Sequence, residues 1–330
     1  MIYIESKSHN PCFNLALEQY VFDCMDRNED YFMLWQNENT IVVGKNQNTI
    51  AEINQDFVEK NHITVVRRLS GGGAVYHDLG NLNFTIIVSK TNNMSDFDFS
   101  RFNKPVVRAL AKLGVHAEIS GRNDITIDGR KFSGNAQYMK QGRIMDHGAI
   151  LYDANLSILS QALKVSKDKI ESKGIKSVRA RVTNVLDCMP TKVPLETFKK
   201  VLLEEMAGQE TITRHELTEA EIAAVTKLEK ERYDTWEWNY GYSPKYDIEK
   251  ERYIPGCGKF QIHLNVKDGR IVDFDIFGDY FGNKEKDELK PILIGAKINR
   301  EDLNRVLAPV DIDQFFHNLP KETFIDMLVK

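Results

Sequence analysis

The residues whose types and spacing best suit chemistry are concentrated in a glycine-rich stretch at residues 67–81, with the sequence RRLSGGGAVYHDLGN. Three consecutive glycines between two β-branched runs make a poor strand interior, because glycine weakens strands. The same glycines allow the backbone to approach a ligand closely and to direct successive N–H groups at an anion. Arg67 or Arg68 adds a bidentate donor for phosphate or carboxylate. A flexible hairpin turn is the alternative, and the flanking arginines and the HDLGN sequence count against it.

A second group of polar residues follows as GRND at residues 121–124 and KFSGNAQ at residues 131–137. The intervening sequence predicts a β-hairpin, because Asp128 and Gly129 can supply the two positive-φ positions of a tight turn. Lys131 would then lie near a hairpin and be followed by small residues, which favours a lysine placed over a crevice. A solvated surface lysine is the ordinary alternative, and position alone does not decide between them.

The standard nucleotide-binding motifs do not occur in the sequence. Residues 256–260, GCGKF, resemble half of a phosphate loop, but Tyr253 stands where the motif needs glycine and Phe260 where it needs serine or threonine. No G-x-G-x-x-G sequence follows a predicted strand. A P-loop or Rossmann nucleotide site is therefore not expected.

Composition and charge indicate a globular protein of a reducing compartment. The 330 residues are 42% hydrophobic and 28% charged, and the net charge of -4 argues against a polybasic nucleic-acid-binding surface. Four cysteines without a C-x-x-C pair are too few for a disulfide scaffold. Neither a secretory signal nor an apolar run of membrane-spanning length is visible. We therefore expect a cytoplasmic protein with no membrane segment and no nucleic-acid partner.

The elements that must position these residues are short strands alternating with helices. Asn10 followed by Pro11 predicts a helix start, because asparagine caps helices and proline suits the first helical position. β-branched and aromatic runs predict strands. The predicted strands are residues 2–5, 31–36, 40–44, 63–67, 82–88, 116–120 and 144–152, with a second Asp-Gly hairpin over 260–277. Further helices are predicted at residues 101–113, 155–163, 195–206 and 219–233.

Proline usage suggests two regions, because seven of the nine prolines lie at residue 190 or beyond. The predicted fold is α+β: a large catalytic domain of mixed β-sheets with helices, and a small α+β C-terminal accessory domain. The catalytic domain is expected over residues 1–190, running to about residue 245 with a helical connector. The accessory domain is expected over residues 246–330.

Taken together, the motifs resemble the lipoate–protein ligase family. The likeness is carried by RLSGGGAVYHDLGN at residues 68–81, GRND at 121–124, KFSGNA at 131–136 and HG at 147–148. NPCFNLALE at residues 10–18, GKNQN at 44–48 and WEWNYGYSP at 236–244 extend the likeness over nearly the whole chain.

The resemblance implies a fold similar to biotin protein ligases and activation of lipoate by ATP, with Mg²⁺ accompanying the triphosphate. Lys131 matches the family's essential lysine and is expected to contact both the carboxylate and the α-phosphate, with Asp124 as a metal ligand. Tyr76 could also pack on adenine. The residues expected to bind ATP or the adenylate are Arg68, Gly73, Ala74, Val75, Tyr76, Asn81, Lys131 and Ala136. The residues expected to bind lipoate are Leu15, Trp35, Arg68, Ser70, Gly72, Lys131 and His147. Without the motifs, Leu15, Trp35 and His147 would be read equally well as core residues.

The implied second substrate is an apo lipoyl-domain protein, either the E2 component of a 2-oxoacid dehydrogenase or the glycine-cleavage H protein, and the ligase is expected to be a monomer. Three alternatives remain. An octanoyl or lipoyl acyltransferase of the same superfamily would need a cysteine nucleophile, and no cysteine lies between Lys131 and His147. A biotin protein ligase would have a different glycine–arginine loop. A non-catalytic lipoyl- or nucleotide-binding paralogue would not need the intact Arg68 and Lys131.

Residues 164–181 form a basic segment that contains only two acids, Asp168 and Glu171. A solvated basic loop is the ordinary interpretation. Its KSV and VTN sequences also resemble the family's adenylate-binding loop, which implies a lid that closes over an anionic adenylate.

Overall fold

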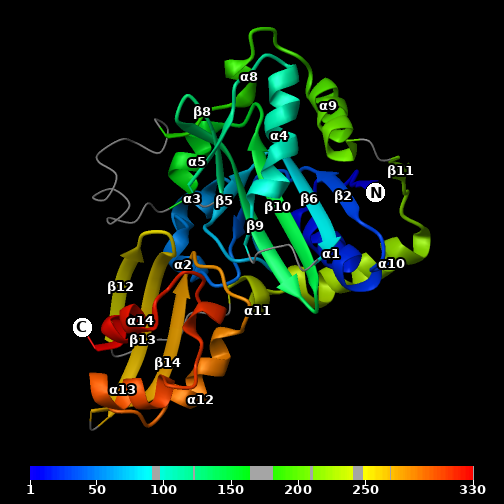
Figure 1. Cartoon of the computed structure of the whole chain (residues 1–330). Helices are drawn as coiled ribbons and strands as arrows, with labels where there is room; N and C mark the ends of the chain where they lie inside the picture. Colours follow the sequence, from blue (N-terminus) through cyan, green and yellow to red (C-terminus); the bar gives the residue numbers. More distant parts are fainter. Residues whose placement is uncertain are drawn as a thin grey trace.

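Three β-sheets organise the chain in a computed structural model, which describes residues 1–90, 97–121, 123–163, 181–208, 211–240, 248–267 and 269–329. An eight-stranded and a three-stranded sheet are built from residues before 215, and a second three-stranded sheet from residues after 247. Figure 1 shows this last sheet at the lower left, with helices of its own. The chain therefore has the predicted α+β fold, with a mixed larger part and a small C-terminal β-sheet unit.

The large sheet has the strand order β11-β1-β2-β6-β10-β9-β8-β7. β1 pairs in parallel with β2 and β11, and the remaining neighbours are antiparallel. The predicted hairpin is confirmed between β8 and β9, where Asp128 and Gly129 have φ values of 50° and 71°. The strands are β1 (Ile2–Glu5), β2 (Tyr31–Trp35), β6 (Asn81–Ser89), β7 (Glu118–Ser120), β8 (Asp124–Ile127), β9 (Arg130–Lys140), β10 (Arg143–Leu151) and β11 (Thr213–Arg214).

The small sheet of the larger part has the order β4-β3-β5, with β3 (Thr40–Val43), β4 (Thr64–Arg67) and β5 (Val75–His77). Three helices surround it: α2 (Thr49–Glu52), α3 (Gln55–Lys60) and α5 (Leu156–Ala162). The apolar side chains of the sheet form a core of their own with those of α3 and α5. Because β4 ends at Arg67 and β5 begins at Val75, the glycine-rich stretch is the loop that joins them.

Helices cover both faces of the large sheet (Figure 1). On one face, α4 and α9 bury a cluster that includes Phe84 and Phe132 of the sheet. On the other, α1 packs on Trp35 and Met145, and Asn10 caps this helix by accepting a hydrogen bond from the Cys12 N–H at 2.9 Å. The remaining bounds are α1 (Pro11–Cys24), α4 (Ser100–Lys112), α8 (Val185–Cys188), α9 (Leu195–Ala207), α10 (Glu219–Leu228), the π-helix η1 (Glu229–Tyr233) and α11 (Trp236–Asn239).

The C-terminal unit is an antiparallel sheet, β12-β13-β14, packed against short helices. Aromatic side chains fill its core, with Phe260, Phe316 and Phe324 fully buried. Its elements are β12 (Ile248–Ile254), β13 (Gly258–Lys267), β14 (Arg270–Gly278), η2 (Lys286–Leu289), α12 (Lys290–Leu293), α13 (Arg300–Leu307), η3 (Ile312–Gln314) and α14 (Lys321–Val329). The predicted boundary near residue 245 falls at residues 241–247, outside the described ranges, and stays a prediction.

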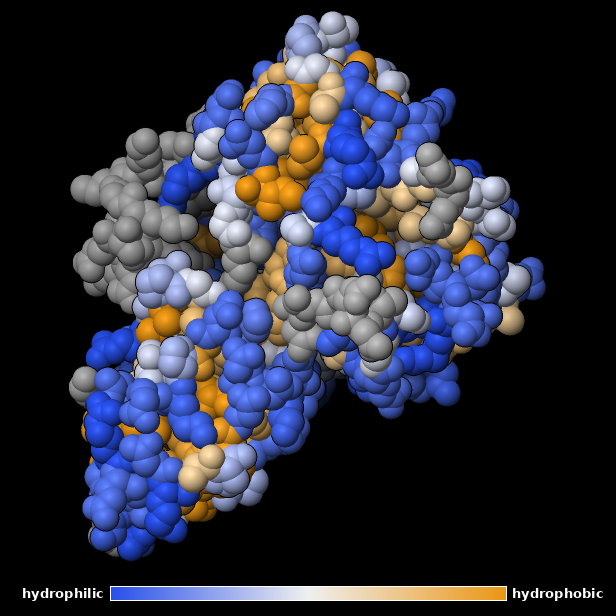
Figure 2. All heavy atoms as spheres, in the orientation of Figure 1, coloured by the Kyte–Doolittle hydropathy of each residue, from blue (hydrophilic) through white to orange (hydrophobic). Residues whose placement is uncertain are grey.

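Most predicted elements are confirmed, with two kinds of difference. The helix predicted over residues 219–233 is an α-helix only to Leu228, and its last turn is a π-helix. Strands β5, β11 and β12 and the helices α2, α3, α8 and α11 were missed. β12 is a charged edge strand with the sequence IEKERYI, and the others have only two to six residues each. Within the described ranges, no helix is both long enough and apolar enough to cross a membrane. Figure 2 shows a mainly hydrophilic visible face with small apolar patches.

Candidate active site

The glycine-rich loop is shaped by close backbone approaches that only glycine allows. Gly72 has a φ of 86°, a conformation that residues with side chains rarely adopt. A Cβ atom on Gly44 would lie 2.0 Å from the Gly72 carbonyl oxygen. A Cβ on Gly71 would lie 2.3 Å from the carbonyl oxygen of Tyr280, which belongs to the C-terminal unit. The loop is therefore packed between the small sheet and the segment after β14.

The C-terminal unit contacts the larger part at the glycine-rich loop. The Gly278 N–H donates to the Asn46 carbonyl at 2.7 Å, and Lys45 pairs with Glu285 at 2.5 Å. The Phe281 ring is buried in a small aromatic cluster with Phe97 and Phe99 of the larger part. A cavity of about 320 Å³ lies at this junction, and the residues that line it include Gly71, Tyr138 and Lys286.

Arg68 holds the glycine-rich loop from inside. Its side chain is buried and donates to the Gly71 and Gly73 carbonyls at 2.6 and 2.9 Å and to the Val42 carbonyl at 3.3 Å. Its Nε donates to the Ser70 hydroxyl at 3.0 Å. Burial lowers the pKa of the Arg68 guanidinium to about 10, so it remains charged at neutral pH. In this conformation most of its five N–H groups bind the loop itself.

Lys131 lies at the start of β9 beside Asp124, with its Nζ 2.7 Å from the Asp124 carboxylate. Both side chains are about two-fifths exposed, at 41% and 37%. A β-bulge at this point, where Thr126 pairs with Lys131 and Ile125 with Ser133, leaves the intervening Phe132 free to enter the core. A Cβ on Gly134 would lie 2.6 Å from the Lys131 Nζ, so the ammonium occupies the space above this glycine.

The register of the sheet places Lys131 and the predicted lipoate-binding residues over one face. Gly134 pairs with Ala149, and Ala136 pairs with His147, so residues 134, 136 and 147 share a face. The Lys131 ammonium lies above Gly134 on that face. Thr85 pairs with both His147 and Met33, which brings β6 and β2 into the same surface.

A buried hydrogen-bond network joins most of the predicted lipoate-binding residues. The His147 Nε2 lies 2.6 Å from the Ser70 hydroxyl, and its Nδ1 lies 2.9 Å from a Glu18 carboxylate oxygen. The Thr85 hydroxyl donates to the same carboxylate, and the Trp35 indole N–H donates to Thr85 at 2.9 Å. Leu15 packs in the same apolar cluster as Trp35. Sequence reasoning missed Glu18 and Thr85, although Glu18 closes the NPCFNLALE motif.

The remaining predicted adenylate-binding residues are placed around this network. Ala136 on β9 pairs with His147 on the neighbouring strand β10. Ala74 and Val75 are half-buried at the end of the loop. Tyr76 differs from expectation, because its ring is buried in the core of the small sheet and its hydroxyl bonds Asn39 at 3.1 Å. Its ring is therefore not placed to stack on adenine. Asn81 is buried, accepts from the Asp78 N–H at 3.0 Å and has an amide nitrogen without a partner among the described residues.

His77 follows the loop and is buried beside Arg68 and His147. Burial and these two neighbours lower the pKa of the His77 imidazole to about 3. The ring is therefore neutral at physiological pH, and it contacts the Trp35 ring edge-on at 6.2 Å between centroids.

A metal ion would need ligands from the substrate at this site. No group of three or more histidine, cysteine or acidic side chains is placed to hold a metal ion in the part of the chain that the structure describes. Asp124, the predicted ligand, is engaged by Lys131. Mg²⁺ commonly binds through phosphate oxygens, water and one or two carboxylates, so Asp124 with a triphosphate fits that pattern.

Two further features bear on the site. Arg122 and most of the predicted lid, residues 164–180, lie outside the described ranges, but the chain that follows the lid is anchored beside Lys131. The Thr183 N–H donates to the Lys131 carbonyl at 3.0 Å, and Val182 forms a bridge with Lys131.

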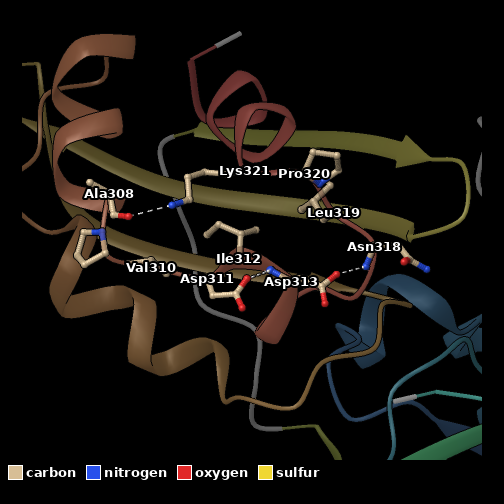
Figure 3. Close-up of a pocket in the computed structure, with 10 residues that line it drawn as sticks. Ala308, Val310, Asp311, Ile312, Asp313, Asn318, Leu319, Pro320 and Lys321 are labelled. Atoms are coloured by element: carbon tan, nitrogen blue, oxygen red, sulfur yellow. Dashed lines mark hydrogen bonds between the residues drawn. The ribbon is translucent and has the colours of Figure 1, made fainter. Parts of the chain in front are cut away.

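A groove of about 610 Å³ in the C-terminal unit lies between Ala308 and Lys321, and it contains none of the predicted site residues (Figure 3).

The space above Gly134 gives a first testable prediction. We expect Gly134→Ala to displace the Lys131 ammonium, because the new methyl group would occupy its position and the flexible lysine can move away. For the adenylation that the family resemblance implies, the expected rate is about tenfold lower, from misplacement of one charged group. Pre-steady-state pyrophosphate release measures this rate. An unchanged rate in a folded variant would show that Lys131 acts from another position.

Residues 10–207 match the family described as the lipoyl protein ligase A/B catalytic domain, and residues 243–328 match the bacterial lipoate protein ligase C-terminus. The chain is 45% identical to lipoate-protein ligase LplJ of Bacillus subtilis, over 99% of this chain and 100% of that protein. It is 41% identical to lipoate–protein ligase 1 of Staphylococcus aureus, over 97% of each. The chain belongs to the lipoate–protein ligase family.

Solved structures agree with this assignment. The P. falciparum LipL1 complex with lipoate has a TM-score of 0.81 at 27% identity and covers 99% of this chain and 98% of that one. An archaeal bipartite ligase from Thermoplasma acidophilum, solved with its E2 lipoyl domain, has a TM-score of 0.66 at 30% identity, covering 75% and 98%. A lipoate-protein ligase A bound with ATP has a TM-score of 0.64 at 28% identity, covering 73% and 98%.

Proposed function

We propose that this chain, acting as a monomer in the cytoplasm, converts lipoate and MgATP to lipoyl-AMP and transfers the lipoyl group to a lysine of a lipoyl domain. As a member of its family, the chain is an ATP-dependent lipoate–protein ligase. The observation that carries the residue assignments is the shared sheet face, on which the Lys131 ammonium and the His147–Ser70–Arg68 network lie together.

Lys131 is suited to the first half-reaction because two anions must meet there. A lipoate carboxylate oxygen attacks the α-phosphorus, and the bond from that phosphorus to the pyrophosphate oxygen breaks. A cation between the two groups offsets their repulsion and the charge that develops in the transition state. Lys131 can leave Asp124 for the substrate, since the pair is partly exposed and surface ion pairs are weak.

The glycine-rich loop supplies the second requirement, a surface for the nucleotide. Its backbone can approach a phosphate closely, and Arg68 keeps the loop in one conformation through the Gly71 and Gly73 carbonyls. Mg²⁺, when bound with the triphosphate, would neutralise phosphate charge, and Asp124 is the residue that would hold it. The buried end of the site, with Trp35 and Leu15, would accept the apolar lipoyl chain.

In the second half-reaction, the amine of the acceptor lysine attacks the carbonyl carbon of lipoyl-AMP. The bond from that carbon to the AMP oxygen breaks, the amine loses a proton and an amide forms. We propose an E2 lipoyl domain of a 2-oxoacid dehydrogenase or the glycine-cleavage H protein as acceptor, and the archaeal ligase solved with its E2 lipoyl domain supports the first of these.

Pyrophosphate release tests this function directly. We expect release with lipoate and MgATP, none with biotin, and a mass increase of one lipoyl group on an apo lipoyl domain added afterwards. Release without any transfer to a panel of apo acceptors would limit the function to adenylate formation. No release with lipoate would overturn the proposal.

One observation in the structure favours the acyltransferase alternative, because it places a cysteine near Lys131. Cys188 lies in the larger part with its Sγ 3.5 Å from the Thr183 hydroxyl, next to the anchor beside Lys131. The other three cysteines are less suitable. Cys12 is buried, which raises the pKa of its thiol to about 12, Cys257 is buried in the C-terminal unit, and Cys24 ends α1.

We expect Cys188→Ser to keep the lipoylation rate within about twofold of the wild type, because a ligase passes the acyl group through AMP and needs no thiolate. The measurement is lipoyl transfer to an apo lipoyl domain with lipoate and MgATP. Normal pyrophosphate release with transfer abolished would instead indicate a cysteine thioester and favour the acyltransferase mechanism.

A further inference from the structure

We propose that Glu18 is a positioning residue for adenylation, which fixes the tautomer of His147 and, through Ser70, the orientation of Arg68 at the glycine-rich loop. This inference deepens the proposed function and rests on it. Glu18 lies on α1 and is only 2% exposed, and it comes from a part of the chain remote in sequence from both the loop and β10.

The hydrogen-bond directions in this network follow from the chemistry of its two ends. Arg68 can only donate, so Ser70 accepts from its Nε at 3.0 Å. An ionised Glu18 can only accept, so it accepts hydrogen bonds from the Thr85 hydroxyl and from the His147 Nδ1–H, the latter at 2.9 Å. We assign His147 the tautomer with hydrogen on Nδ1 only, in which Nε2 accepts a hydrogen bond from the Ser70 hydroxyl at 2.6 Å. Every donor in the chain from Arg68 to Glu18 has an acceptor.

Charge balance supports an ionised Glu18. Arg68 is buried and positive, and an isolated buried charge is costly unless a counter-charge and hydrogen bonds compensate it. Glu18 is the negative group that most favours the charged form of Arg68. His147 and Ser70 connect these two side chains in one buried unit.

Loss of Glu18 would change the network in a specific way. Without an acceptor at Nδ1, the His147 proton would move to Nε2, and the ring would then donate to the Ser70 oxygen instead of accepting from its hydroxyl. The Ser70 hydroxyl proton would lose its acceptor, and Ser70 would turn from the position that now holds the Arg68 Nε. The Arg68 contacts to Gly71 and Gly73 would loosen, and with them the loop that we propose binds the nucleotide.

The same three side chains also have the distances of a serine nucleophile, a histidine base and a carboxylate. Two observations favour a positioning role. Ser70 is only 1% exposed, and its oxygen already accepts from Arg68. A covalent role would leave a lipoyl ester on Ser70, which intact mass measurement after incubation with lipoate and MgATP would detect. Finding that ester would overturn the positioning role.

The test compares Glu18→Leu, Glu18→Gln and a control, Gln19→Ala. Gln19 is the next residue of α1, is also buried and bonds Arg232 and Tyr233, outside the network. We expect Glu18→Leu to lower kcat/KM for pyrophosphate release about 100-fold, as misplacement near a reaction centre does. Glu18→Gln keeps an acceptor oxygen and should recover at least tenfold of that loss. Gln19→Ala should lose stability but little activity.

The tautomer of His147 gives a second measurement, which would not change if Glu18 had a merely structural role. Long-range ¹⁵N–¹H spectra of the folded, full-length protein should show the Nδ1–H form in the wild type and in Glu18→Gln, and the Nε2–H form in Glu18→Leu. An unchanged tautomer in a folded Glu18→Leu, or activity equal to that of Gln19→Ala, would overturn the inference. If Glu18→Leu does not fold, an Nε2–H tautomer in the wild type would overturn it equally. An inactive wild type with the Nδ1–H tautomer would instead count against the proposed function.

Discussion

Lys131→Ala is expected to reduce lipoyl-AMP formation by at least about 10²–10³-fold, because it removes the cation beside Asp124 that we propose contacts both reacting anions. Stability should hardly change. Lys131 is 41% exposed and its pair with Asp124 is partly exposed, and such pairs contribute at most about 1 kcal/mol. Pyrophosphate release and thermal unfolding measure the two quantities separately.

Lys140→Ala is the matched control for Lys131→Ala. Lys140 is an exposed lysine at the other end of the same strand, β9, where it lines the junction cavity, so its removal changes net charge equally without touching Lys131 or Asp124. We expect it to adenylate lipoate at close to the wild-type rate. Near-normal adenylation by Lys131→Ala, or an equal loss in both variants, would remove Lys131 from the mechanism.

Local backbone chemistry explains why much of the fold was predictable. The Asp128–Gly129 turn follows from two residues that tolerate positive φ, and the helix start at Asn10 follows from a cap and a proline. The glycine-rich loop was predicted as a non-strand segment because glycine weakens strands, and it does join β4 to β5. In each case the deciding interaction lies within a few residues along the chain.

The features that were missed depend on contacts between distant segments. Glu18 has a role only because α1, β6 and β10 meet, which brings it to Thr85 and His147. The burial of the Tyr76 ring depends on which face of a three-residue strand meets the small core. Residues 279–281 reach the glycine-rich loop across some 200 positions of sequence, and no local pattern signals such a contact.

The Lys131 environment was partly predictable, because the hairpin beside the lysine is a local feature of the sequence. Sequence reasoning placed the lysine beside a hairpin with small residues after it, and the hairpin is present. It did not identify why the residue three positions later is glycine. The structure gives the reason, since a Cβ on Gly134 would lie 2.6 Å from the ammonium and 3.3 Å from Asp124. Small residues that make room for a charge become recognisable only with the register of the strands.

Gly72→Val is expected to weaken nucleotide binding at least about 100-fold while affecting lipoate binding much less, because a shifted loop misplaces the groups that we propose contact the phosphates. The φ of 86° at Gly72 is unfavourable for a β-branched residue, at a cost of about 1–3 kcal/mol. A Cβ there would also lie 3.0 Å from a terminal nitrogen of Arg68, so relief of the strain would disturb the side chain that holds the loop.

Gly142→Val separates backbone strain from site damage in this experiment. Gly142 has a φ of 72° in the turn between β9 and β10, and a Cβ there would meet open space, so valine should be strained to a similar degree away from the loop. Isothermal titration with a non-hydrolysable lipoyl-adenylate analogue and with lipoate alone measures both affinities. We expect the two variants to lose similar stability and only Gly72→Val to lose adenylate affinity. Adenylate affinity within a few-fold of the wild type in a folded Gly72→Val would mean that the glycines serve only as a turn, and the nucleotide would then have to bind elsewhere on the sheet face that carries Lys131.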